Sequence, residues 1–217
     1  MIVVIDGPAG AGKSSAARAL ARRLGFRFLD TGAMYRAVVL AALRQKLELA
    51  DAAALAALAR TLHIELAGDR VLLAGEDVTS TIRSADITAL THYAADNPAV
   101  REHLVELQRA AAGQHNVVSE GRDQGTVVFP HAECKFFVTA SPAERARRRM
   151  RDLEARGEHL GFDEVLAAQE LRDTRDRTRA VGPLIPAADA LEIWTDGLSP
   201  DEVVARLESI VRAKMAQ

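Results

Sequence analysis

The residues with the clearest chemistry stand near the start of the chain, where residues 7–14 read GPAGAGKS. They match the pattern G-x-x-x-x-G-K-[ST] in full. Gly7, Gly10 and Gly12 let backbone N–H groups turn inward onto a chain of phosphates, and the N-terminus of a following helix adds positive partial charge there. The pattern therefore predicts a phosphate-binding loop.

Side chains at the end of this loop extend the same chemistry. Lys13 should bridge the β- and γ-phosphates of a bound nucleotide, and Ser14 is positioned to ligate magnesium. Ser15 offers a second hydroxyl that binds phosphate or shares that task. The alternative is a glycine-rich turn that only joins a strand to a helix. We predict that ATP is held by the whole loop, namely Gly7, Pro8, Ala9, Gly10, Ala11, Gly12, Lys13, Ser14 and Ser15.

Strand and helix signals place the loop in an α/β fold. The apolar run IVVI precedes the loop and a helix follows it, and residues 26–30 then lead into a second helix. Later apolar runs within 116–123, 134–140 and 190–196 end in polar residues, as buried parallel strands do. The pattern predicts a P-loop NTPase-type parallel sheet flanked by helices.

Two segments interrupt this alternation. Residues 40–115 combine an alanine-rich helix, a small antiparallel ribbon near 63–82 and a long helical tract from about 84 to 113. Residues 150–178 are helical and densely charged. Because neither segment carries a second set of core strands, we expect both to be mobile lobes of one domain over 1–217. The core would then comprise about residues 1–39, 116–149 and 179–217.

Composition excludes several other classes of protein. The 217-residue chain has a net charge of −2 and a pI near 6.3, whereas proteins that coat nucleic acid are usually strongly basic. No run reaches about 18 apolar residues, so no membrane helix is expected. The single cysteine, Cys134, cannot form an internal disulfide and is expected to be a buried thiol. We expect a cytoplasmic monomer with neither nucleic acid nor membrane as partner.

Charged residues also follow two later predicted strands, at the sheet edge that the loop shares. Arg36 could pair bidentately with an acceptor phosphate, although an exposed helix arginine is equally common. Glu120 could orient magnesium-bound waters, Arg122 could bind phosphate and Asp123 could accept hydrogen bonds from an amino group. For each of these alone, a surface salt bridge is as common. Together the junctions predict one crevice.

Arginines are dense in the second interrupting segment and its flanks. Ten arginines stand against eight acidic residues between Arg145 and Arg179. A phosphoryl transition state spreads negative charge over several oxygens, so a lid that brings guanidinium groups onto it would stabilise that charge and exclude water. Solvated ion pairs on a helix surface are the default for about half of these arginines.

Four blocks, in order along nearly the whole chain, resemble the bacterial cytidylate kinases: GPAGAGKSS, DTGAMYRA, SEGRDQGTVVFP and RDTRDRTRAVGPLIPAADA. The last three are much more specific than the loop. The resemblance implies a single P-loop kinase domain, with a monophosphate-binding lobe over about 40–115, which contains the antiparallel segment, and a lid over about 150–178. It implies transfer of a phosphoryl group from ATP to CMP or dCMP with Mg²⁺.

The resemblance also implies which side chains bind CMP. Arg36, Arg122 and Arg179 would grip the acceptor phosphate, and Arg172 and Asp176 would hold the sugar hydroxyls. Separately, lid contacts to ATP are assigned to three arginines on one predicted helix, Arg145, Arg148 and Arg149.

The base and its surroundings involve a second group of residues. The resemblance implies that Arg101 and Asp123 read the cytosine edge, and that Thr31 lies near the nucleotide. The family has a serine near the base where this chain has His92, preceded by Thr91. His92 could donate to the cytosine carbonyl, or it could be an exposed helix histidine while Thr91 or water takes over.

The expected mechanism is in-line transfer with little covalent work by the protein. Lys13, Arg122 and Arg179 would be the catalytic residues, because they neutralise charge. The acceptor oxygen is already an anion at neutral pH, so no strong base is required. Two alternatives stay open: a P-loop kinase for another small acceptor, such as a different nucleoside monophosphate or shikimate, and a P-loop ATPase stimulated by nucleic acid.

Overall fold

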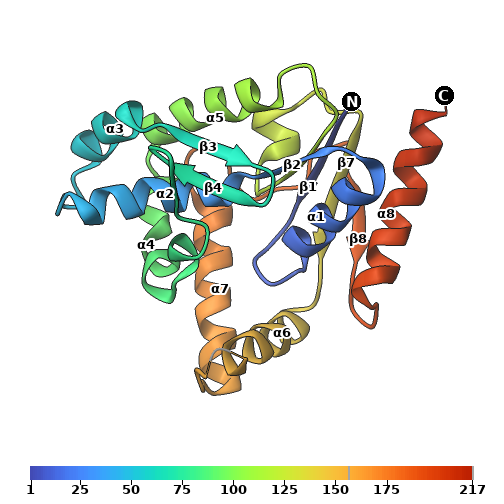
Figure 1. Cartoon of the computed structure of the whole chain (residues 1–217). Coiled ribbons are helices and arrows are strands. Elements are labelled where there is room, and N and C mark those ends of the chain that lie inside the picture. The colour runs from blue at the N-terminus through green and yellow to red at the C-terminus, as the bar shows by residue number, and fades with distance from the viewer. Residues whose placement is uncertain (156, 217) are drawn as a thin grey trace. The chain divides into compact units, whose positions relative to one another are not determined.

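The computed structural model describes residues 1–155 and 157–216, which form two compact units (Figure 1). Unit 1 joins Met1–Phe26 to the chain from Val117 onward, and unit 2 is Arg27–Asn116. Unit 2 therefore starts before the lobe that the sequence predicts over about 40–115. The predicted lid includes residue 156 and the predicted core includes residue 217, and both lie outside the described residues. The division into core, lobe and lid stays a prediction.

Unit 1 contains a parallel sheet. Its strands lie in the order β6, β1, β7 and β8, which are Val117–Glu120, Ile2–Asp6, Cys134–Thr139 and Leu191–Trp194. The predicted strands are confirmed, and Cys134 is buried as expected. Ile5 lies opposite both Glu120 and Phe136. The segments that follow β1 and β6 therefore leave the same edge of the sheet.

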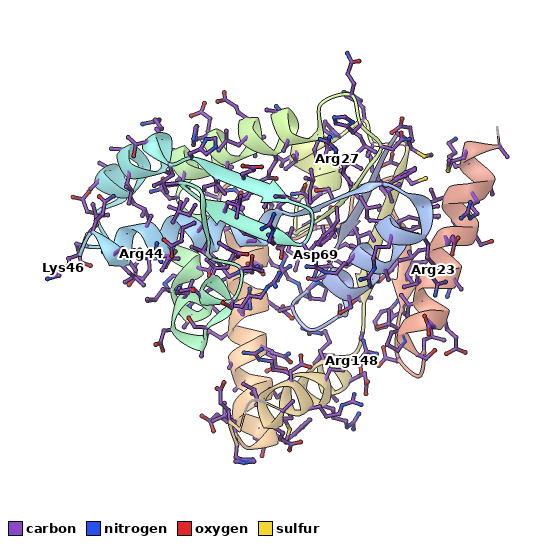
Figure 2. All side chains as sticks on the ribbon, viewed as in Figure 1. Arg23, Arg27, Arg44, Lys46, Asp69 and Arg148 are labelled. Atoms are coloured by element: carbon purple, nitrogen blue, oxygen red, sulfur yellow. The ribbon has the colours of Figure 1, made fainter. Side chains whose placement is uncertain are left out.

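Two helices of unit 1 pack side by side, α1 (Lys13–Leu24) and α8 (Pro200–Met215) (Figure 1). Arg23, labelled in Figure 2, extends from α1 to Asp201 of α8 at 2.8 Å. Helix α8 begins with a capping box, in which the Ser199 side chain accepts from the Glu202 N–H and the Glu202 side chain accepts from the Ser199 N–H.

Two further helices, α6 (Pro142–Glu154) and α7 (Phe162–Thr178), form a pair in unit 1 (Figure 1). They pack around the buried side chains of Ala146, Leu153 and Val165. The predicted helical character of residues 150–178 is confirmed within both helices, whereas residues 157–161 between them are not helical. The π-helical turn η2 (Gln124–Val128), which lies between β6 and β7, was not predicted.

Unit 2 is built from helices and short strands around an apolar core of its own. The helices and the 3₁₀ turn η1 of unit 2 are α2 (Thr31–Arg44), α3 (Ala52–Thr61), η1 (Thr81–Arg83), α4 (Ala85–Ala95) and α5 (Pro98–Ala112). Its strands are β2 (Arg27–Asp30), β3 (Ile64–Ala67), β4 (Arg70–Leu73) and β5 (Glu76–Asp77). Strands β3, β4 and β5 pair antiparallel, which confirms the predicted ribbon.

The prediction of one helical tract from 84 to 113 was wrong, because the tract breaks between α4 and α5. The Asn97 side chain accepts hydrogen bonds from the N–H groups of Ala99 and Val100, and Pro98 occupies the first helical turn. An asparagine cap followed by proline is a strong start signal, so a new helix begins there. No helix among the described residues is both long and apolar enough to cross a membrane.

Candidate active site

The predicted phosphate loop joins β1 to α1. Gly7, Gly10 and Gly12 have φ angles of 144°, 76° and 87°, which side chains disfavour. A Cβ on Gly7 would lie 2.0 Å from the Val138 carbonyl oxygen, so the loop runs directly against the backbone of β7. Glycine is therefore required at position 7 for the loop to approach the sheet this closely.

Lys13 is buried at the end of this loop, with 5% of its surface exposed. Its Nζ donates a hydrogen bond to the Pro8 carbonyl at 2.6 Å. Burial, followed by the Arg122 guanidinium, lowers the pKa of Lys13 to about 7, while Glu120 opposes the shift. A bound anion such as a phosphate would stabilise the charged form of this lysine and raise its pKa again.

Ser14 and Glu120 bring two oxygen ligands together. The Ser14 hydroxyl donates to Glu120 Oε1 at 2.8 Å, and Ser14 and Ser15 are both exposed at the start of α1. Mg²⁺ prefers oxygen ligands and usually keeps several waters, so the pair fits a magnesium ion bound directly by Ser14 and through water by Glu120.

Asp6 is a buried carboxylate that the sequence reasoning missed. It accepts hydrogen bonds from the backbone N–H groups of Gln124 at 2.9 Å and Gly125 at 2.8 Å. Burial raises the pKa of Asp6 to about 6, although both N–H groups lower it. This carboxylate ties the end of β1 to the π turn and so fixes the position of Asp123. Its place at the end of the first strand, just before Gly7, was the available signal.

Four of the predicted acceptor-binding residues meet in unit 1. Arg122 Nε donates to Asp176 Oδ2 at 2.8 Å, and Arg179 lies 3.8 Å from Asp176 and 3.7 Å from Asp123. Burial lowers the pKa of Arg122, but the carboxylates around it, Asp176 first and then Glu120 and Asp173, together raise it above its usual value. Two arginines and two carboxylates thus form a compact, partly buried charge network, referred to below as the arginine–aspartate network.

Asp176 is also influenced by Arg172, one turn earlier on α7. Burial raises the pKa of Asp176, but Arg122, then Arg172 and Arg179, lower it below its usual value. Arg172 also contributes to the lowered pKa of Lys13. The predicted sugar-binding pair therefore lies within electrostatic range of both the loop lysine and the network.

The arginines of α6 reach the backbone of the loop. Arg145 Nη1 donates to the Ala9 carbonyl at 2.9 Å. Arg148, labelled in Figure 2, donates to the Thr195 carbonyl at 2.8 Å and lies 3.5 Å from the Ala11 carbonyl. Arg149 is half-buried on the same helix. Helix α6 is thus attached to the loop through its arginines.

In unit 2, two arginines share one carboxylate. Asp30 caps α2 by accepting from the Ala33 N–H at 2.9 Å, and it lies 3.3 Å from Arg36 Nη2 and 3.0 Å from Arg83 Nη2. The cluster therefore carries a net positive charge. The sequence reasoning identified Arg36 and missed Arg83, which η1 brings to Asp30 from 53 residues away along the chain.

The predicted residues around the base are divided between the units, with Asp123 in unit 1 and Thr31, His92 and Arg101 in unit 2. Thr31 and Arg101 are buried, each with 2% exposed surface, and the Arg101 guanidinium lies 5.5 Å from the centre of the Tyr35 ring. His92 is half-buried, with Nδ1 2.8 Å from the Ala89 carbonyl. The Thr91 hydroxyl donates to the Ile87 carbonyl.

Comparison with known proteins gives a consistent match. The family described as cytidylate kinase matches residues 3–213. A cytidylate kinase of Rhodopirellula baltica is 49% identical, covering 98% of this chain and 93% of that protein. One of Pelotomaculum thermopropionicum is 50% identical, covering 97% and 96%. One of Mycobacterium leprae is 48% identical, covering 99% and 96%.

Among solved structures, an uncharacterized protein from Eubacterium ventriosum aligns with a TM-score of 0.52 at 11% identity, over 100% of this chain and 99% of that one. At that identity the likeness concerns the fold alone. The family match, by contrast, spans both units and includes the loop, the arginine–aspartate network and the Asp30 cluster. The chain belongs to the cytidylate kinase family.

Proposed function

We propose that the chain transfers the γ-phosphoryl group of ATP to CMP or dCMP, giving ADP and CDP or dCDP. The observation that carries the proposal is an arrangement within unit 1: Ser14 of the loop bonds Glu120 at the end of β6, and Arg122, two residues later, pairs with Asp176 in the arginine–aspartate network. Arg122 and Arg172 both depress the pKa of Lys13. Lys13, which is suited to bind the donor phosphate, therefore lies within electrostatic range of Arg122, which is suited to bind the acceptor phosphate.

The proposed roles combine these positions with what the resemblance to the family implies. The loop, Gly7 to Ser15, holds ATP, assisted by Arg145, Arg148 and Arg149. The residues proposed to bind CMP are Thr31, Arg36, His92, Arg101, Arg122, Asp123, Arg172, Asp176 and Arg179. Transfer requires the CMP phosphate in line with the γ-phosphate, and Lys13, Arg122 and Arg179 stabilise the charge that builds up on the phosphoryl oxygens.

Magnesium is proposed as the metal, held by Ser14 and, through water, by Glu120. When bound, it neutralises charge on the β- and γ-phosphates. The chain's own part is to keep the Ser14 hydroxyl and the Glu120 carboxylate 2.8 Å apart at the end of the loop.

A panel of acceptors tests the proposal. Purified protein with magnesium and ATP should release ADP with CMP and dCMP at least about 10-fold faster than with UMP, AMP, GMP or shikimate, since an acceptor that leaves the polar groups of the site unpaired is discriminated against. Single-stranded RNA or DNA should not stimulate hydrolysis. A preference for another acceptor, or stimulation by polynucleotide, would replace the proposal with one of the two alternatives.

Proton uptake on ATP binding tests the state of Lys13. The pKa of Lys13 is about 7 in the free protein, and anionic phosphates raise it. At pH 8 most of the free protein therefore carries neutral Lys13 and should take up a proton when ATP binds, whereas at pH 6 Lys13 is already charged. ATP affinity should accordingly fall as the pH rises above 7.

Calorimetry of ATP binding in two buffers with different ionisation enthalpies measures this uptake. The matched control is Lys13→Arg, because a guanidinium stays protonated at both pH values. Equal proton uptake by the wild type and by Lys13→Arg at pH 8 would show that Lys13 does not titrate.

A further inference from the structure

The Arg145 side chain is buried and bonds only to other parts of the protein interior. Only 3% of its surface is exposed. Nη1 donates to the Ala9 carbonyl in the loop at 2.9 Å, and Nε donates to the Ala140 carbonyl after β7 at 3.1 Å. Nη1 also lies 2.6 Å from Asp173 Oδ2 on α7. One guanidinium thus joins the phosphate loop, the end of a sheet strand and α7.

Helix α7 contacts the loop through one face. Gln169 and Asp173 are four residues apart and therefore lie on the same side of the helix. The Gln169 Nε2 donates to the Arg145 carbonyl at 3.2 Å, and a Cβ added to Gly10 would lie 2.8 Å from that Nε2. The loop at Gly10 is therefore packed directly against this face of α7.

The neighbouring positions of α7 carry the predicted acceptor-binding residues. Asp176 pairs with Arg122, and Arg172 influences both Asp176 and Lys13. Helix α7 is consequently linked to the phosphate loop through Asp173 and Arg145, and it belongs to the arginine–aspartate network through Asp176. The two sets of contacts are separated by less than one helical turn.

The buried ion pair of Arg145 with Asp173 is expected to add little to the free energy of unfolding. Its side chains are 4% and 3% exposed, and desolvation of a buried pair commonly cancels the attraction between the charges. A buried pair does fix geometry, because each charge has to keep its partner. The main effect of this pair is therefore to fix the position of the Ala9 carbonyl, to which Arg145 donates.

On the basis of the proposed function, we propose that the Arg145–Asp173 pair positions the phosphate loop for ATP. The pair holds the Ala9 carbonyl, and with it the N–H groups of the loop, at a fixed place relative to α7 and its acceptor-binding residues. Arg145 then acts on ATP through the loop backbone. Asp173 and Gln169 are positioning residues that support Arg145.

Three variants test the proposal in the full-length protein. Asp173→Asn keeps the shape but removes the charge, and Arg145→Lys keeps the charge but loses the planar fork. Gln169→Leu removes only the bond to the Arg145 carbonyl. For Asp173→Asn and Arg145→Lys we expect the Kd and KM for ATP to rise about 10-fold, as for loss of a charge-assisted hydrogen bond, while the KM for CMP stays within about 2-fold. Gln169→Leu should show the same direction with a smaller rise.

The apolar double variant Arg145→Met with Asp173→Leu separates positioning from stability. Replacing a buried pair by apolar residues of similar volume commonly preserves stability. We expect a Tm near that of the wild type with ATP affinity still reduced about 10-fold. Recovery of wild-type ATP affinity in this variant would overturn the proposal, because the pair would then serve stability alone. If Asp173→Asn fails to fold, the ATP affinities of Arg145→Lys and of the double variant still test the proposal.

Glu170→Gln is the matched control, because Glu170 is exposed on the same helix. It should leave the KM values for ATP and CMP unchanged. The proposed function fails if the wild type does not phosphorylate CMP or dCMP. The positioning role alone fails if the wild type is active and the three single variants bind ATP as tightly as it does.

Discussion

Lys13→Ala is expected to lower kcat/KM for CMP phosphorylation by about 1,000-fold, as is found when a preorganised group that stabilises transition-state charge is removed. Lys13 is 5% exposed and sits at the end of the loop, where water cannot replace a lost ammonium group well. Its Nζ is held by the Pro8 carbonyl, so the amino group is already in place before ATP binds. The measurement is a coupled assay of ADP release at varied ATP and CMP.

Lys214→Ala provides the matched control, since Lys214 is an exposed lysine on α8. It should retain wild-type activity. Lys13→Arg should still bind ATP through its charge but lose nearly as much activity as Lys13→Ala, because a planar guanidinium cannot place its charge where the ammonium group does. Retention of more than a tenth of the activity by Lys13→Ala would rule out the role given to this lysine.

Arg179→Ala is expected to lower kcat/KM for CMP by about 100-fold while the Kd for ATP changes by less than about 2-fold. The Arg179 side chain is 5% exposed and lies between Asp123 and Asp176. Without it, the two carboxylates lose a neutralising charge where an acceptor phosphate has to bind. Removing one partner from such a buried set usually costs several kcal/mol, and that loss should appear in acceptor binding.

Arg177→Ala is the control for this variant, because Arg177 is exposed at the end of α7, two residues before Arg179. Steady-state kinetics with each substrate varied in turn, combined with calorimetry of ATP binding, separate the two substrates. An equal loss of ATP and CMP binding in Arg179→Ala would contradict the acceptor role of Arg179.

The parts of the fold that rest on local patterns could be predicted from the sequence. The loop is specified by eight consecutive residues and two flanking elements, and the cap of α8 by Ser199 and Glu202. The ribbon from β3 to β5 followed from alternating residues and tight turns. In each case the partners are close in sequence, so residue type and spacing are enough to indicate the geometry.

Contacts between distant segments could not be predicted in this way. Asp6 finds the N–H groups of the π turn more than a hundred residues later, and Arg83 reaches Asp30 across 53 residues. Asp173 looks like one more charge on a charged helix until the fold places Arg145 beside it. The break at Asn97 is different, because its cap signal was local and was overlooked within a long helical pattern.

The most direct test of the central claim follows the fate of the transferred group. Purified protein is mixed with magnesium, CMP and ATP labelled with ³²P at the γ-phosphate, and the products are separated. The label should appear in the β-phosphate of CDP, with little in inorganic phosphate. Label found only in inorganic phosphate, or remaining in ATP, would show that the chain does not transfer the phosphoryl group to CMP.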